Sequence, residues 1–355
     1  MSRTLIIKTS SMGDVIHNLP IVADMRRARP DLAIDWVVEE AYADLVRMHP
    51  GVDRVIPIAL RRWRAAGFGA ATRAERAAFR AQIREQRYDL VLDTQGLIKS
   101  ALIARLAHLT TSGVRAGFSF DLAREGLARL FYDRGYRVDP RLHAIERLRA
   151  LAAAALGYTN DVLGLPQFGL RVPPQRFDWL AATGTAPAYA VLLHATARTE
   201  KAWPLDRWSA LMRALIDAGI APVLPWGNAG EEAAAQALAS GSASPSGLRV
   251  VRACVPPRLT LPEVAALLAG ASAVVGVDTG LTHLAVALDA PTVGIFGATP
   301  RWRYAPYWTP RAINLGNDGE LGLQPTTTAV LEALARLGVL QDARSAVDSA
   351  ADGNG

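Results

Sequence analysis

The sequence predicts an α/β protein of two Rossmann-like domains, each built around a parallel β-sheet. Short apolar runs typical of buried strands alternate with longer amphipathic stretches typical of helices, and this alternation indicates βαβ units. The pattern occurs twice, before and after a stretch that contains four prolines and is typical of a linker. The length of 355 residues agrees with two domains, since one domain contains roughly 100–200 residues.

The alternation divides the chain into five parts. We expect a first domain over residues 1–165, a linker over 166–187 and a second domain over 188–325. A C-terminal helix is expected over 326–342, and the small polar residues of 343–355 predict a disordered tail. Because ligands of open parallel sheets bind outside the carboxyl ends of the strands, we expect the two domains to face a cleft that holds the functional site.

The first domain shows four strands and four helices. The expected strands are Leu5–Lys8, Ile34–Val38, Arg54–Ile58 and Leu90–Asp93. The expected helices are Asp14–Arg27, Glu75–Gln86, Leu97–Ala107 and His143–Leu156. Thr72 and Glu75 have the spacing of a capping box, so we expect the second of these helices to start at Thr72.

The second domain repeats the alternation. Its expected strands are Ala190–His194, Pro222–Pro225, Arg249–Ala253, Ala273–Val277 and Thr292–Phe296. Its expected helices are Leu205–Ala218, Glu231–Ala239, Leu261–Ala269 and Leu281–Leu288. Thr260 and Glu263 form a second capping-box pattern, at the start of the third helix.

Composition narrows the kind of protein. The net charge of +6 favours anionic partners, which include phosphates, acidic lipids and nucleic acid. The single cysteine, Cys254, cannot form an internal disulfide, and we expect it to be a small buried apolar residue. No apolar run has the length of a signal peptide or approaches the roughly 20 residues that span a bilayer. We therefore expect a cytoplasmic protein that at most contacts a membrane surface.

The segment Lys8–Asp14 lies between the first expected strand and the first helix. Small polar residues and glycine suit an anion here, because free amides and the helix dipole favour negative charge. We expect Ser10 and Gly13, within this turn, to contact a negatively charged ligand. The segment matches neither the dinucleotide-binding nor the P-loop fingerprint. Asp14 has two interpretations at this point: a helix cap, or a catalytic carboxylate at the edge of the cleft.

Two segments of the second domain also follow expected strands. His194–Pro204 contains hydroxyls, an arginine and a lysine, which suit a diphosphate, although a solvated loop explains them equally well. In Asp278–His283, Thr279 and Gly280 present backbone amides at a helix start, where a phosphate can bind. Asp278 can instead be a simple cap, and a lone histidine such as His283 is more often structural.

A basic stretch runs from Arg54 to Arg87, with nine arginines and only two acids. Its centre, Arg61–Arg64, includes Trp63, which suits a sugar face or a membrane interface. Arginines bind phosphate with two parallel hydrogen bonds. A solvated helix face explains the later arginines of the stretch well, but it explains the central cluster less well.

Few other chemical signatures are present. Glu231 and Glu232 follow an expected strand, where a carboxylate can bind a ribose or simply begin a surface helix. No cluster of cysteine and histidine has the spacing of metal ligands, so we assign no metal ligand. No Gly-x-Ser-x-Gly nucleophile motif is present.

Together these segments resemble the lipopolysaccharide heptosyltransferases, particularly those of type I. The resemblance covers roughly residues 3–335. Its most specific parts are Lys8–Asp14, Trp36–Glu40, Arg61–Arg64, Asp93–Ser100, His194–Trp203, Leu224–Gly227 and Asp278–His283. So many matches in the same order would not arise by chance.

The resemblance implies an inverting glycosyltransferase of the GT-B fold, with the acceptor in the first domain and the donor in the second. It implies ADP-L-glycero-D-manno-heptose as the donor and a Kdo residue of Kdo-bearing lipid A as the acceptor. The donor is a substrate, so no cofactor is expected. Such an acceptor implies a protein peripheral to the cytoplasmic face of the inner membrane, and no nucleic-acid partner.

The resemblance also implies roles for single residues. Asp14 matches the family's general base. The matches to its diphosphate contacts are Thr196, Lys201, Asp278, Thr279 and Gly280. The other residues assigned to donor binding are Ser10, Gly13, Glu231 for the ribose, Leu259 near the adenine and His283. The basic residues that match those meeting the anionic acceptor are Arg61, Arg62, Arg64 and Lys99.

The sequence departs from the family pattern at two positions. Type I enzymes commonly have two successive threonines where this chain has Thr196-Ala197, and Leu259 replaces an expected methionine, an apolar exchange that should be tolerated. Three other functions stay open. They are a type II heptosyltransferase, a sugar-nucleotide epimerase of the GT-B fold, and a non-enzymatic regulator that binds a nucleotide sugar at the membrane surface.

Overall fold

A computed structural model describes residues 2–67, 69–159, 164–181, 188–196, 198–241, 251–316 and 324–340. The chain divides into two compact units, Met1–Arg171 and Val172–Gly355. The boundary between them falls within the stretch 166–187, where the sequence predicts a linker. The expected tail 343–355 lies outside the described residues.

The first unit contains a six-stranded parallel sheet with the strand order β3-β2-β1-β4-β5-β6. The strands are β1 (Arg3–Ile7), β2 (Ala33–Glu39), β3 (Arg54–Ile58), β4 (Arg87–Asp93), β5 (His108–Phe118) and β6 (Arg134–Tyr136). The central strands are buried along almost their whole length, which explains their continuous apolar sequences. Because β1 and β4 are neighbours, the loops that follow them lie side by side.

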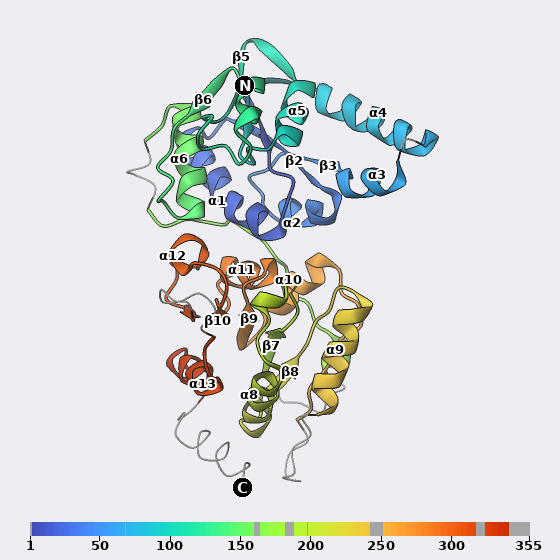
Figure 1. Ribbon diagram of the computed structural model, residues 1–355, viewed down its shortest axis with the longest axis vertical. Coiled ribbons are helices and arrows are strands. Elements are labelled where there is room, and N and C mark those ends of the chain that lie inside the picture. The colour runs from blue at the N-terminus through green and yellow to red at the C-terminus, as the bar shows by residue number, and fades with distance from the viewer. Residues whose placement is uncertain are drawn as a thin grey trace. The chain divides into compact units, whose positions relative to one another are not determined.

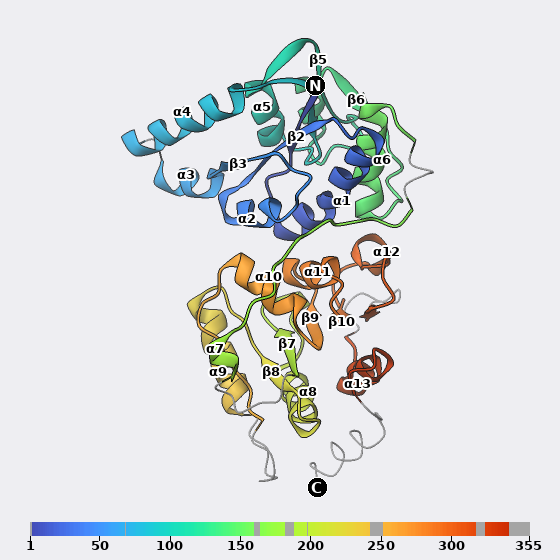
Figure 2. The same ribbon diagram turned by 180° about the vertical axis from the view of Figure 1, so that it is seen from behind.

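Helices cover both faces of this sheet. They are α1 (Met12–Ala28), α2 (Ala43–Arg47), α3 (Leu60–Ala66), α4 (Ala70–Arg84), α5 (Ile98–Leu106) and α6 (Ala144–Leu156), with the 3-10 helices η1 (Glu40–Tyr42) and η2 (Gly126–Phe131). On one face α1 packs against α6, and a buried ion pair of 2.7 Å joins Asp24 to Arg149. The helices α3, α4 and α5 lie on the other face (Figures 1 and 2). Their apolar side chains pack with Leu5 and Ile7 of β1.

The second unit contains a five-stranded parallel sheet with the order β11-β10-β9-β7-β8. The strands are β7 (Tyr189–Leu193), β8 (Ala221–Val223), β9 (Ala273–Val277), β10 (Thr292–Ile295) and β11 (Ala312–Leu315). Its helices are α7 (Asp178–Ala181), η4 (Thr199–Lys201), α8 (Leu205–Asp217), α9 (Ala229–Ser240), α10 (Leu261–Ala269), α11 (Gly280–Ala287), α12 (Arg301–Tyr304) and α13 (Thr327–Arg336). Here β7 and β9 are neighbours, so the loops that follow these two strands meet.

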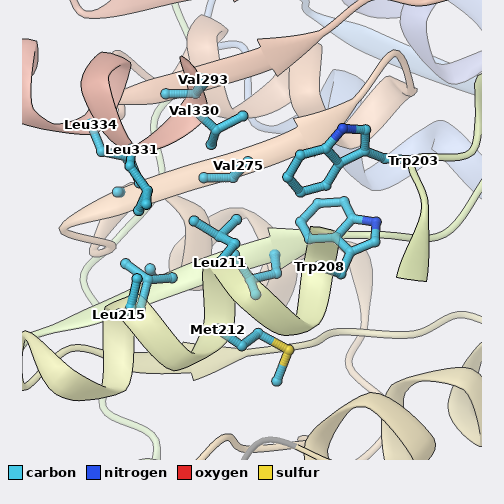
Figure 3. Close-up of a cluster of buried hydrophobic side chains, with 14 of the residues drawn as sticks. Trp203, Trp208, Leu211, Met212, Leu215, Val275, Val293, Val330, Leu331 and Leu334 are labelled. Atoms are coloured by element: carbon cyan, nitrogen blue, oxygen red, sulfur yellow. The ribbon is translucent and has the colours of Figure 1, made fainter. Parts of the chain in front are cut away.

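Two tryptophans organise the core of the second unit. Trp203 and Trp208 meet edge to face with ring centroids 4.9 Å apart. They pack with apolar side chains from α8, from β9 and β10, and from α13 (Figure 3). Fully burying one large apolar side chain contributes roughly 1.5–3 kcal/mol to stability. This cluster therefore fixes the start of α8, and with it the loop that carries Lys201.

Two predictions about these elements were wrong. The helix expected at Thr72 begins at Ala70, because the Glu75 carboxylate accepts hydrogen bonds from Arg62 and Trp63 and does not return to a Thr72 cap. Arg61–Arg64 precedes this helix, as the sequence indicates, and lies within the separate short helix α3. Of the strand expected over 249–253, the described residues 251–253 are not in a strand. Cys254, which is only half-buried, makes a single parallel bridge to Val223, and the prolines that follow it cannot continue a ladder.

The other capping box is confirmed. The backbone N–H of Thr260 donates to a Glu263 carboxylate oxygen at 2.7 Å, and the Thr260 hydroxyl accepts from the Glu263 N–H.

Candidate active site

Asp14 lies in the first turn of α1, at the carboxyl edge of the first sheet. Its Oδ2 atom accepts hydrogen bonds from the Ser11 backbone N–H at 3.1 Å and from the Ser11 hydroxyl at 2.9 Å. Ser11 is the N-cap and Asp14, the third residue of the helix, completes a capping box with it, so Asp14 is not itself the N-cap. The Asp14 side chain is 30% exposed, which allows a ligand to reach it. Ser10 and Gly13, both half-buried, flank this turn.

Two cationic side chains surround the Asp14 carboxylate. Lys8 Nζ lies 4.0 Å from Oδ1, and the Arg124 guanidinium lies 3.9 Å from Oδ2. Burial, the largest influence, raises the pKa of Asp14, but Lys8, the Ser11 hydrogen bonds and Arg124 together outweigh it, and the pKa is below its ordinary value. Asp14 is therefore ionised at neutral pH and can accept a proton, as a weak base.

Lys8 is almost completely buried. Burial lowers the pKa of its ammonium group, and the nearby negative charge of Asp14 partly opposes this shift. The ammonium donates to the Thr94 carbonyl oxygen at 3.3 Å. Lys8 and Asp14 thus form a partly buried pair of opposite charges at the end of β1.

A buried network holds the loops after β1 and β4 together. Gln95 Oε1 accepts hydrogen bonds from the Thr9 backbone N–H at 2.7 Å and from the Thr9 hydroxyl at 2.9 Å. Asp93 accepts from the backbone N–H groups of Gln95 and Gly96, and its other oxygen accepts from the Tyr132 hydroxyl at 2.7 Å. This network orients the segment that leads to Asp14.

The second unit has its own charged cluster. Lys201 Nζ donates to Asp278 Oδ2 at 2.7 Å, and His283 Nε2 lies 3.1 Å from Asp278 Oδ1. Burial, the largest influence, raises the pKa of Asp278, but the hydrogen bond and charge of His283 and the hydrogen bond from Lys201 together outweigh it, so the pKa is well below its ordinary value. A carboxylate repels phosphate, so this geometry suits Asp278 to orienting Lys201 rather than to contacting a diphosphate itself.

The start of α11 directly follows Asp278 in this cluster. Thr279 is the N-cap of α11 and Gly280 is its first residue, so the positive end of the helix dipole lies at this point. The Thr196 hydroxyl accepts from the Arg198 backbone N–H at 3.3 Å. Ala197, where the sequence departs from the family pattern, lies outside the described residues.

Glu231 lies after strand β8, and Leu259 lies after Cys254, which makes a β-bridge to β8. The Glu231 carboxylate accepts hydrogen bonds of 2.8 Å from the Gly227 backbone N–H and from the Asn228 side-chain amide. These bonds hold the carboxylate at the start of α9. Leu259 is half-buried directly before the Thr260 cap of α10.

The structure separates the predicted acceptor residues into two groups. Arg62 binds Glu40 through two hydrogen bonds of 3.0 and 3.1 Å and binds Glu75 at 2.8 Å. Trp63 is buried, and its indole N–H donates to Glu75 at 2.6 Å, so the expectation of an accessible Trp63 was wrong. Side chains of α3 and α4, with Glu40 of η1, line a pocket of about 280 Å³ beside this ion pair.

The second group of acceptor residues is exposed. The side chains of Arg61, Arg64 and Lys99 have no carboxylate within 4.0 Å among the residues that the structure describes. These three cations, unlike Arg62, are available to an anionic ligand without breaking an ion pair.

Within the described ranges, no group of three or more histidine, cysteine or acidic side chains could hold a metal ion. No helix in the described part of the chain is long and apolar enough to cross a membrane.

The two parallel-sheet units, each with charged loops at the carboxyl ends of its central strands, define a glycosyltransferase of the GT-B class. The family model described as glycosyltransferase family 9 (heptosyltransferase) matches residues 76–329, and the chain belongs to this family.

Relatives and solved structures agree with this assignment. The chain is 47% identical over 299 residues to the lipopolysaccharide heptosyltransferase 1 of Escherichia coli strain K12, covering 84% of this chain and 88% of the relative. The enzyme of the same name from Pseudomonas aeruginosa is 43% identical, and the match covers 84% of this chain and 79% of the relative. The structure of E. coli heptosyltransferase WaaC with ADP has a TM-score of 0.81 and 40% identity, covering 94% of this chain and 99% of that one.

Proposed function

We propose that the protein transfers L-glycero-D-manno-heptose from its ADP-linked donor to a Kdo residue of Kdo-bearing lipid A. The observation that carries the proposal is the ionised, accessible carboxylate of Asp14 beside Lys8 and Arg124. Support for the donor comes from a solved relative, 41% identical, described as WaaC with ADP-2-deoxy-2-fluoro heptose.

The reaction is a single displacement at the heptose anomeric carbon. An acceptor hydroxyl oxygen attacks this carbon while its bond to the ADP oxygen breaks, and ADP leaves with the bonding electrons. Asp14 accepts the hydroxyl proton. Because its pKa is low, Asp14 takes the proton late, when the new carbon–oxygen bond has largely formed. One displacement inverts the anomeric configuration, and the two substrates suffice without a cofactor.

The second unit supplies the donor site. Lys201, held in place by Asp278 and His283, offsets the charge that develops on the departing diphosphate. The Thr196 hydroxyl and the backbone amides of Thr279 and Gly280, at the start of α11, donate hydrogen bonds to the same diphosphate. The other residues assigned to the donor are Glu231 for the ribose, Leu259 for the adenine, and Ser10 and Gly13 of the first unit.

The acceptor is strongly anionic, and exposed cations of the first unit suit it. Arg61, Arg64 and Lys99 are free to meet carboxylates or phosphates. Arg62 can do so only if it leaves Glu40 and Glu75. An acceptor embedded in lipid also places the protein at the cytoplasmic face of the inner membrane, as a peripheral protein.

A type II heptosyltransferase is the nearest alternative. The identities favour type I, because the lipooligosaccharide heptosyltransferase 2 of Haemophilus influenzae is 25% identical, against 47% for the type 1 enzyme of E. coli. An epimerase or a binding regulator would need no lipid acceptor.

Transfer of labelled heptose distinguishes these functions. The assay offers labelled ADP-heptose with Kdo-lipid A, with an already heptosylated acceptor, or with no acceptor. We expect labelled lipid only from Kdo-lipid A. Label only on the heptosylated acceptor would indicate type II, and label on neither would reject the proposal.

A further inference from the structure

Exposed apolar side chains of the adjacent elements α5 and η2 have no part in the proposed reaction. Leu102 of α5 is 50% exposed, and Leu127 and Leu130 of η2 are 55% and 73% exposed. The two elements pack together through Ala101 and Ala128, the neighbours of two of these leucines. Grouped exposed apolar side chains of this kind mark interaction sites.

The ring of Phe120 extends this surface. Phe120 is 58% exposed, and its ring lies so close to Gly126 that a β-carbon added there would be 3.3 Å from it. We call Leu102, Phe120, Leu127 and Leu130 the α5–η2 patch.

Two exposed cations flank the patch on α5. Lys99 and Arg105 lie three residues before and after Leu102, on the same side of α5, and both are exposed. Neither has a carboxylate within 4.0 Å among the described side chains. Residues 60–134 contain 14 lysines and arginines but seven acids, a net charge of +7, whereas the whole chain has +6. The positive charge of the protein is thus concentrated in the segment that contains the patch.

We infer that the α5–η2 patch seats the protein on an anionic lipid bilayer. Apolar side chains flanked by basic ones bind at a membrane interface, because the apolar groups enter the boundary of the acyl chains while the cations attract acidic headgroups. The inference rests on the proposed function, because an acceptor embedded in lipid requires contact between the protein and the membrane. The α5–η2 patch is the surface that makes this contact.

The patch is physically connected to Asp14. Arg124, 3.9 Å from the Asp14 carboxylate, lies in the loop between Phe120 and η2. In the same loop, the Glu125 N–H donates to the Gly96 carbonyl oxygen at 2.9 Å, and its carboxylate accepts from the Ile98 N–H at 2.7 Å. A bilayer held by the patch therefore presents an embedded acceptor near the catalytic carboxylate.

Vesicle flotation tests the inference with the full-length protein. The probes are vesicles of phosphatidylcholine alone and of phosphatidylcholine with phosphatidylglycerol in equal parts. The variant combines Leu102→Gln, Leu127→Gln and Leu130→Gln, and the matched control is Leu205→Gln, a leucine of α8 that is 65% exposed. We expect the wild type to bind the acidic vesicles more strongly than the vesicles of phosphatidylcholine alone. High salt should weaken its binding to the acidic vesicles. The triple variant should lose about tenfold or more of this binding, and the control none.

Turnover on a short soluble Kdo acceptor separates the two proposals. The triple variant should keep wild-type turnover on this soluble acceptor, because the three substituted side chains are exposed and none of them is assigned to catalysis or to substrate binding. Vesicle binding that is unchanged in the triple variant would overturn the inference. Absence of wild-type binding to acidic vesicles would also overturn it and would leave the patch to a protein partner. If the wild type bound vesicles through the patch but transferred no heptose, the proposed function would be wrong, and the inference about the membrane-binding patch would remain valid.

Discussion

Lys201 donates a 2.7 Å hydrogen bond to the carboxylate of Asp278, which lies 77 positions later in the chain. The two residues meet because they follow β7 and β9, which are adjacent parallel strands. His283, on the first turn of α11, binds the other oxygen of the same carboxylate. The ammonium of Lys201 is therefore oriented before any anion arrives, which is the arrangement that stabilises a leaving group.

Lys201→Ala should weaken ADP binding and slow transfer together. A hydrogen bond assisted by charge contributes about 1.5–3 kcal/mol, so the dissociation constant for ADP should rise roughly ten- to 150-fold. Calorimetric titration with ADP measures it. Arg198→Ala removes an exposed cation of the same loop that pairs with Glu200 at 2.7 Å, and it serves as the control. Equal ADP affinity in wild type and Lys201→Ala would remove Lys201 from the diphosphate site.

Lys8→Met should change the pH dependence of transfer. The positive charge of Lys8 lowers the pKa of Asp14, so its removal raises that pKa. Asp14 then becomes protonated, and inactive as a base, already at a higher pH. The acidic limb of the plot of kcat/KM against pH therefore shifts to higher pH. Arg124→Gln should move it in the same direction, because Arg124 is the second cation. An acidic limb that stays in place in both variants would show that Asp14 is not the titrating base.

Arg62→Glu and Arg64→Glu should have different effects although the residues are two positions apart. Arg62 forms ion pairs with both Glu40 and Glu75. A glutamate at position 62 would place three carboxylates close together, and their repulsion should lower the melting temperature. Arg64 has no such partner among the described residues, so Arg64→Glu should leave the melting temperature unchanged but raise KM for Kdo-lipid A. Equal melting temperatures for the two variants, or an unchanged KM in Arg64→Glu, would contradict this division.

Tyr132→Phe should destabilise the first unit. It removes the hydroxyl that donates to the buried Asp93 carboxylate at 2.7 Å, and an unsatisfied buried group costs about 1–3 kcal/mol. Tyr189→Phe, which removes a bond to the neutral Leu267 carbonyl, should cost less. Urea unfolding of both variants measures the difference, and an equal or larger loss in Tyr189→Phe would show that Asp93 does not depend on Tyr132.

The alternation of apolar runs predicted most of the two sheets. The strands at Arg54–Ile58 and Ala273–Val277 and the helix at Leu261–Ala269 have the bounds that the sequence indicates. These segments are either short apolar runs, as in a buried parallel strand, or begin at a recognisable cap. By contrast, β5 (His108–Phe118) was missed, because most of its first half is exposed and its sequence is polar.

The chemistry at Asp14 could be predicted only in part. Its position before a helix and after a strand was visible in the sequence, as was its membership of a motif. The approach of Arg124 was not, because it depends on how the loop after β5 folds back onto the loop after β4. The pairing of Arg62 with Glu40 and Glu75 was hidden for the same reason, since no local pattern specifies which charges will meet.

The assignment of Asp14 as the base of heptosyl transfer is tested most directly by Asp14→Asn in the transfer assay with Kdo-lipid A. The amide is almost the same size and can still accept a hydrogen bond from Ser11, but it cannot take the proton. General-base catalysis typically contributes 10²–10⁴-fold in rate. We predict that the variant folds, binds ADP-heptose as the wild type does and loses turnover by about that factor. Near-normal formation of labelled lipid by the variant would contradict the account.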